Sequence, residues 1–171
     1  NNKSLLIGFS ETVIYSGKNR SLDIGYLNPI SSHLEIELND RLNVIGSWNA
    51  NAVWQAHFDL MIKQRIRFSA NILFDEFVID PDIQINKEHG NAYSFRVVYN
   101  LIKSKEHIFS LNYSFLKIGT PTFRHGDGMN NFINAGKPLG WQGGSDGIEW
   151  KFGANYFNRK NLISSVCIIY L

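Results

Sequence analysis

Apolar and polar residues alternate over segments of up to 13 residues, and this limits the possible folds of the chain more than any other feature. Such alternation is typical of a β-strand with one apolar face. Between Asn51 and Lys63 one set of alternate positions is apolar: Ala52, Trp54, Ala56, Phe58, Leu60 and Ile62. Similar patterns cover 66–78, 93–101, 109–115 and 148–156, and weaker ones about 5–15 and 162–171. We predict an all-β fold with about seven strands.

The length of these strands favours a membrane-spanning sheet. Strands of soluble proteins usually contain about 5 to 6 residues, whereas a tilted strand that crosses a bilayer needs about 9 to 11. In an outer-membrane barrel the apolar face of the sheet contacts lipid and the polar face lines the lumen. In a soluble sandwich the apolar face would instead pack on a second sheet, and this is the alternative. The chain has no run of about 18 apolar residues, so a transmembrane helix is not expected.

Short and long connections alternate along the chain. The short ones lie at Gln64, Ser104–Glu106 and Asn158–Lys160, and the long ones at about 16–50, 79–90 and 119–146. Transmembrane barrels have short periplasmic turns and long external loops. The pattern therefore predicts an antiparallel, up-and-down transmembrane β-barrel. Within the first long connection, Ile30, Leu34 and Leu38 have helical spacing and predict a short helix over 29–40.

The predicted barrel is incomplete. Bacterial single-chain barrels usually have an even number of strands, and bare sheet edges are not viable in lipid. The start of the chain, "NNKSLLIGFSETV", also lacks the basic start, apolar block and cleavage site of a signal peptide. We expect residues 1–171 to be part of one larger barrel domain, with at least one closing strand after Leu171 and more strands before Asn1, so that the rest of its own barrel is a partner.

The composition weighs against two classes of site. The net charge is +2 and the cationic residues are scattered, so nucleic acid is not an expected partner. The single cysteine excludes an internal disulfide framework and a multi-cysteine metal site. We expect no metal site or cofactor. The acids Asp75, Glu76, Asp80 and Asp82 could offer oxygens to calcium, but they form no complete loop pattern and are interpreted as a solvated rim.

Four stretches occur in an order that resembles the C-terminal part of the capsule-assembly protein Wzi family. They are "GFSETVIYSGKNRSL" (8–22), "GYLNP" (25–29), "FDEF" (74–77) and "NAGKPLGWQGGSDG" (134–147). The Pro-Leu-Gly turn with its glycine-rich run and Asp-Gly is the most specific of these. Members of that family are outer-membrane β-barrels that attach capsular polysaccharide to the cell surface. The resemblance implies a non-enzymatic, lectin-like role in the bacterial outer membrane, with surface polysaccharide and outer-membrane lipid as partners.

The last long connection contains the candidate residues for polysaccharide binding. Glycans are bound by aromatic faces and by planar polar groups, and an arginine forms a charge-assisted fork with acidic sugars. Residues of these types in the connection are Arg124, His125, Asp127, Trp141 and Asp146. Alternatively, Trp141 seats the loop on the barrel mouth or belongs to the interfacial aromatic girdle.

A second candidate group is a network of charges in the barrel lumen. Its members would be Glu11, Arg67, Asp75, Glu76 and Arg96. Such a network would suit a plugged barrel or a barrel that transports anions. The alternative is that these residues are charged only because the lumen is polar, and that they pair with one another.

Two other functions stay open at this stage. One is a generic porin or transport barrel. The other is a barrel hydrolase, since His57, Asp59 and serines such as Ser69 and Ser110 occupy polar faces. The chain has no Gly-x-Ser-x-Gly turn, so an enzyme is not expected.

Overall fold

A computed structural model describes residues 3–15, 24–28, 30, 32, 50–76, 88–125, 128, 130–158 and 162–171. The predicted helix over 29–40 lies almost entirely outside these ranges. The described helix is a 3-10 turn, η1 (Ile24–Leu27). No helix in the described part of the chain is long and apolar enough to cross a membrane.

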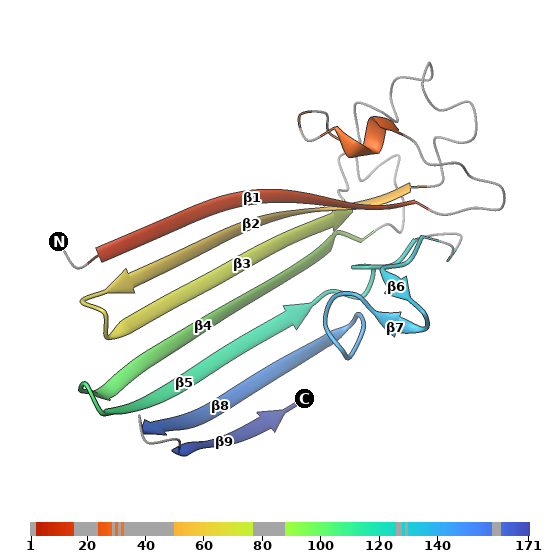
Figure 1. Cartoon of the computed structure of the whole chain (residues 1–171). Helices are drawn as coiled ribbons and strands as arrows, with labels where there is room; N and C mark the ends of the chain where they lie inside the picture. The colour runs from red at the N-terminus through yellow and green to blue at the C-terminus, as the bar shows by residue number, and fades with distance from the viewer. Residues whose placement is uncertain are drawn as a thin grey trace.

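Seven long strands form a single antiparallel sheet, and each strand pairs with its neighbours along the chain (Figure 1). They are β1 (Lys3–Tyr15), β2 (Ala50–Ile62), β3 (Ile66–Glu76), β4 (Gly90–Lys103), β5 (His107–Ile118), β8 (Gly147–Asn158) and β9 (Leu162–Tyr170). The prediction of an all-β fold with seven up-and-down strands is confirmed. The sheet is not closed, because β1 and β9 form its two edges within the described residues.

The two ends of the sheet differ. The pairs Tyr15–Ala50, Glu76–Gly90 and Ile118–Gly147 bring together the strand ends that flank the three long connections. We call this the long-loop end, and the opposite end the turn end. At the turn end, Lys63 and Gln64 link β2 to β3 with φ of 49° and 53°. Positive φ at two adjacent residues is typical of a tight hairpin turn that matches the twist of the strands.

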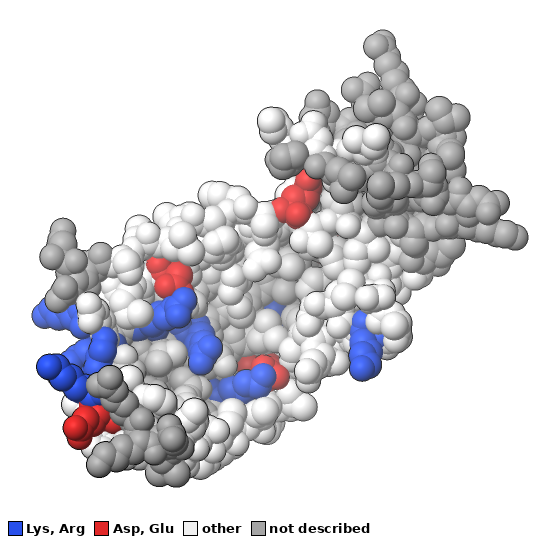
Figure 2. All heavy atoms as spheres, viewed as in Figure 1, with Lys and Arg blue, Asp and Glu red and all other residues white. Residues whose placement is uncertain are grey.

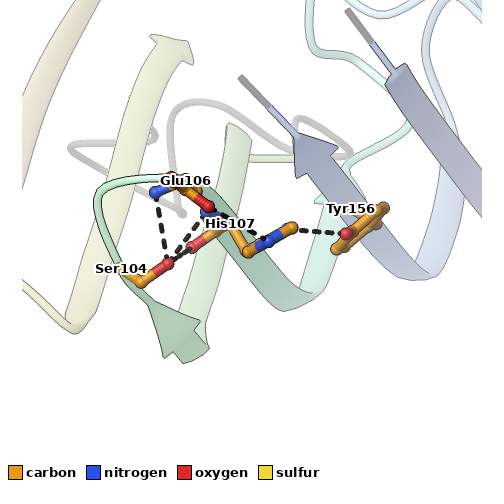
Figure 3. A network of polar contacts seen from close by, with 4 residues as sticks. All are labelled: Ser104, Glu106, His107 and Tyr156. Carbon is orange, nitrogen blue, oxygen red and sulfur yellow. Dashed lines mark hydrogen bonds and ion pairs between the residues drawn. The ribbon is translucent and has the colours of Figure 1, made fainter. Parts of the chain in front are cut away.

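The turn between β4 and β5 is held by side chains (Figure 3). Ser104 Oγ accepts hydrogen bonds from the backbone N–H groups of Glu106 and His107, at 3.3 Å and 2.9 Å. His107 Nδ1 lies 2.8 Å from the hydroxyl of Tyr156 on β8, and the two rings are stacked. The turn is therefore tied to the next strand of the sheet as well as to its own hairpin.

Strand register separates the residues into two faces. One row of paired residues crosses all seven strands on the apolar face: Leu5, Leu60, Phe68, Val97, Tyr113, Phe152 and Ile168. The adjacent row lies on the polar face: Leu6, Asp59, Ser69, Arg96, Ser114, Lys151 and Ile169. The alternation read from the sequence thus aligns across the whole sheet.

No second layer covers the apolar face within the described residues. Phe152 is 54% exposed and Ile168 is 68% exposed, although both lie in the middle of their strands. The buried apolar side chains are few and most lie toward the long-loop end: Ala52, Val53, Ala92, Ile118 and Phe132. The one packed region is therefore the place where the last long connection meets the sheet.

Candidate functional site

The connection between β5 and β8, residues 119–146, folds back onto the sheet. We call it the long loop and describe its residues 119–125, 128 and 130–146. Its first turn is anchored to the start of β4, because the carbonyl oxygen of Asn91 accepts hydrogen bonds from Gly119 N at 2.9 Å and Thr122 Oγ1 at 2.8 Å. Thr122 is fully buried by this contact. The next N–H, that of Phe123, donates to a carboxylate oxygen of Asp75 on β3.

A small aromatic core fixes the middle of the long loop. The rings of Phe123 and Phe132 lie 5.5 Å apart between centroids, and Phe132 is only 4% exposed. The backbone supports this pair, since Phe132 N donates to Phe123 O at 3.1 Å and Leu139 N donates to Phe132 O at 2.9 Å. Two short strands, β6 (Ile133–Asn134) and β7 (Lys137–Pro138), form a hairpin beside it.

Trp141 attaches the last part of the loop to the polar face of the sheet. Its Nε1 donates to Glu149 Oε2 on β8 at 3.1 Å. Its ring lies against Gly143 and Gly147, where a Cβ atom would come within 2.4 Å of the ring. Trp141 and Phe123 also line a pocket of about 210 Å³ together with residues of β2 to β5 on the polar face. This position fits the interpretation that Trp141 seats the loop on the sheet.

Arg124 and His125 line a separate pocket of about 380 Å³ that is formed within the long loop. The other lining residues are Phe123, Asn131, Phe132, Ile133, Pro138, Gly140, Gly143, Gly144 and Ser145. Arg124 is exposed, and its Nε donates to Ser145 Oγ at 2.7 Å. This bond orients the guanidinium, whose terminal nitrogens have no partner among the described residues.

His125 contributes a second polar group to this loop pocket. Its backbone N–H donates to Asn131 Oδ1 at 2.6 Å, which fixes the backbone beside the ring. The ring atom Nδ1 is buried and has no hydrogen-bond partner in the described part of the chain. The pocket is therefore lined by a planar cation, which can bind hydroxyl or carboxylate oxygens, and by a histidine ring whose Nδ1 is buried.

Of the remaining candidates of the long loop, the structure describes Asp146, which lies outside the loop pocket. Asp146 Oδ1 accepts a hydrogen bond from Thr120 Oγ1 at 3.1 Å, so it joins the last residue of the loop to one of the first. Asp127 lies outside the described residues. Ser145 and Asn131 were not expected from the sequence, since short polar residues in a glycine-rich loop give no signal of which side chains they will orient.

The described members of the expected lumen charge network are spread over both faces of the sheet. Arg67 Nε pairs with Asp59 Oδ2 at 2.8 Å, and Ser69 Oγ donates to the same oxygen at 2.7 Å. Arg96 lies on the same face without an acidic partner among the described residues. Glu11 pairs with Trp54 and therefore lies on the apolar face, opposite to both arginines.

Of the acids at the end of β3, Asp75 is the one whose side chain the structure describes. Asp75 is the extra residue of a β-bulge between Phe74 and Glu76, and it accepts the backbone N–H of the long loop. Only the backbone of Glu76 is described, paired with Gly90. Asp80 and Asp82 lie outside the described residues. Among the residues that the structure describes, no group of three or more His, Cys, Asp or Glu side chains is close enough to hold a metal ion.

The geometry around His57 does not join it to a serine. Its ring lies over Gly8 of β1, where a Cβ atom would meet the imidazole at 2.1 Å. Ser69, on the adjacent strand, donates its hydroxyl to Asp59. His57 and Ser69 therefore do not form the hydrogen-bonded pair needed for acyl transfer.

Comparisons with known proteins give no match. No protein-family model, no curated protein and no solved structure is similar to this chain.

Proposed function

We propose that this chain forms part of the wall of an outer-membrane β-barrel that holds capsular or surface polysaccharide on the cell, in a lectin-like and non-enzymatic manner. The proposal rests on the apolar face of the long-stranded sheet, which no second layer covers among the described residues, and on the last long connection, which is folded onto the polar face. A soluble sandwich would need a second sheet on that apolar face.

Strand length supports a lipid environment for the apolar face. β8 has 12 residues, and at about 3.3 Å per residue it is about 40 Å long. Tilted by about 35–45°, as in membrane barrels, such a strand rises about 30 Å, which matches the hydrocarbon thickness of a bilayer. The apolar face has aromatic residues toward both ends of the sheet. Tyr93 and Trp150 lie toward the long-loop end, and Tyr99 and Tyr156 lie toward the turn end. Aromatic girdles at the two interfaces are typical of outer-membrane barrels.

The sheet edges support closure by further strands. Backbone N–H and C=O groups along β1 and β9 need partners if the sheet lies in lipid, because an unsatisfied group there costs several kcal/mol. Strands of the same chain, or of other copies, would supply these partners and close the barrel. The long loop would then cover the mouth of the barrel from the polar side.

The loop pocket is the proposed contact with polysaccharide. Arg124 and His125 offer donors of the kind that bind sugar hydroxyls and carboxylates, and Ser145 holds the guanidinium in place. The glycines around them leave the backbone open to a ligand. Arg124 is proposed as the main contact because an acidic capsule sugar would form two parallel hydrogen bonds with its terminal nitrogens.

The proposal is tested in cells that express the full-length protein with Arg124→Gln. We expect less cell-bound capsule while polymer is still secreted, because export does not depend on the contact. Lys137→Gln is the matched control, since it removes an exposed cation of the same loop outside the pocket. Unchanged surface capsule in Arg124→Gln, or an equal loss in Lys137→Gln, would rule out this role for the pocket.

A second candidate is a transport barrel, which a hollow of about 700 Å³ on the polar face favours. Ion conductance of the purified protein in planar bilayers distinguishes the two functions. A steady open conductance supports transport, whereas a barrel whose mouth is covered by the long loop should conduct poorly.

A further inference from the structure

The polar face of the sheet is hollowed toward the turn end. The hollow, about 700 Å³ in volume, is lined mainly by β3, β4 and β5, with residues from β2 and β8 at its sides. Its polar lining consists of Arg67, Ser69, Asn71, Ser94, Arg96, Asn100, Ser110, Ser114, Glu149 and Asn155. Hydroxyl and amide groups dominate the polar part of the lining and can bind a hydrated solute. The apolar part consists of Met61, Phe95, Val98, Phe115 and Leu116.

The charges on this face do not cancel. Arg67 is paired with Asp59 at 2.8 Å, and Lys151 is paired with Glu149 at 2.8 Å. Arg96 lies between these two pairs in the row across the sheet, and no described carboxylate neutralises it. The central cation of the hollow is thus the one whose charge is available to a ligand.

Hydroxyl donors surround Arg96. Ser114 is its direct partner on β5, at a cross-strand spacing of about 5 Å between Cβ atoms, and Ser94 precedes it by two residues on the same face of β4. Ser94 Oγ accepts a hydrogen bond from Asn71 Nδ2 at 3.3 Å, so its own proton is free to be donated. Ser114 has no hydrogen-bond partner for its side chain among the described residues. Ser69, on the other side, already donates its proton to Asp59.

The turn end adds positive potential to the hollow. Figure 2 shows Lys and Arg side chains gathered at this end of the molecule and continuing over the strands. The described turns there contain Lys63, Arg65, Lys103 and Lys105, with Glu106 as the acid among them. A surface of one sign beside a cleft raises the local concentration of ions of the opposite sign.

We propose that Arg96, with the hydroxyls of Ser94 and Ser114, forms a binding site for a single anionic group, a carboxylate or a phosphate, carried by a hydrated solute. The guanidinium provides charge-assisted hydrogen bonds, and the serines donate to the remaining oxygens of the anion. The site requires only the polar face, so it is independent of the long loop and of any role in holding polysaccharide.

Binding is measured on the purified full-length protein by saturation-transfer NMR, with glucuronate, glucose 6-phosphate and glucose as probes. We expect both anions to bind and neutral glucose not to bind at the same concentration. A signal from glucuronate alone or from the phosphate alone also supports the site and identifies the anionic group. Equal signals from glucose and the two anions would overturn the proposal.

Two variants locate the site. Arg96→Gln should lower the affinity for the anions by about tenfold to a hundredfold, because a hydrogen bond to a charged group is lost. Lys105 is an exposed cation of the nearby turn. Lys105→Gln should change the affinity for the anions by less than about twofold at physiological salt, where screening is strong. Arg96→Lys keeps the charge and should retain part of the binding. If Arg96→Gln does not fold, Arg96→Lys is the variant that tests the role of residue 96 in anion binding. Full affinity in Arg96→Gln, no binding in a folded Arg96→Lys, or an equal loss in Lys105→Gln would each refute the proposal.

Discussion

Phe132→Ala should open the long loop while leaving the sheet intact. The side chain of Phe132 is 4% exposed and packs on Phe123 with 5.5 Å between ring centroids. Truncation of a buried phenylalanine costs about 3–5 kcal/mol in a protein core. At the lower end, about 3 kcal/mol, the population of the open loop should rise about 100-fold. The loop is hydrogen-bonded to the sheet through Asn51, Asp75, Asn91 and Glu149, so the opening should stay local.

Native-state hydrogen exchange measures this opening. The amide of Leu139 donates to the carbonyl oxygen of residue 132 at 2.9 Å, so its protection reports the closed loop. Its protection factor should fall about 100-fold in Phe132→Ala, whereas the amide of Val97 in the centre of β4 should be unchanged. Ile133→Ala is the matched control, since Ile133 is 50% exposed and its truncation should cost less than about 0.5 kcal/mol. If both variants exchange alike, or if Leu139 stays protected in Phe132→Ala, the packing described for the loop is wrong.

Three further predictions concern the sheet and its contacts. Val97→Arg should destabilise the protein in lipid by about 2–4 kcal/mol, whereas Val98→Arg on the polar face should cost much less. Denaturant unfolding in vesicles measures both costs, and equal costs would contradict the assignment of the faces. Gly143→Val should displace the ring of Trp141, because a Cβ atom at residue 143 would lie 2.4 Å from the ring. Tryptophan emission should then move to longer wavelength, and unchanged emission would refute the packing of this ring. Tyr156→Phe removes the hydrogen bond to His107 at the β4–β5 turn and should lower the free energy of unfolding by about 0.5–1.5 kcal/mol. An unchanged free energy of unfolding would show that this bond contributes nothing to stability.

The strands were predictable because their pattern is set locally. An apolar residue at every second position, as from Ala52 to Ile62, can satisfy only a strand with one apolar face. The sequence pattern of β3 extends to Val78, which lies outside the described residues, and it gave no sign of the bulge at Asp75 in the pairing with β4. A bulge depends on the neighbouring strand, so the sequence of β3 alone does not reveal it.

The arrangement of the long loop could not be predicted from its sequence. Its bounds were correct, since β5 ends at Ile118 and β8 begins at Gly147. The burial of Phe132 and Thr122, however, arises from contacts with residues far away in the chain, and loop sequences have no periodicity that would indicate them. The ion pair of Arg67 with Asp59 depends likewise on the register that the β2–β3 turn imposes.

Lipid exposure of the apolar face is measured most directly with spin labels. Single cysteines at Val97 and Val98, with the native Cys167 replaced by serine, are labelled in the full-length protein reconstituted in lipid vesicles. The two positions are adjacent in sequence and lie on opposite faces of β4. A label at Val97 should be accessible to oxygen, which concentrates in lipid, and hardly accessible to a water-soluble nickel relaxant, whereas a label at Val98 should show the reverse preference. A label at Val97 that neither relaxant reaches would mean that protein covers this face and would contradict the membrane-barrel account.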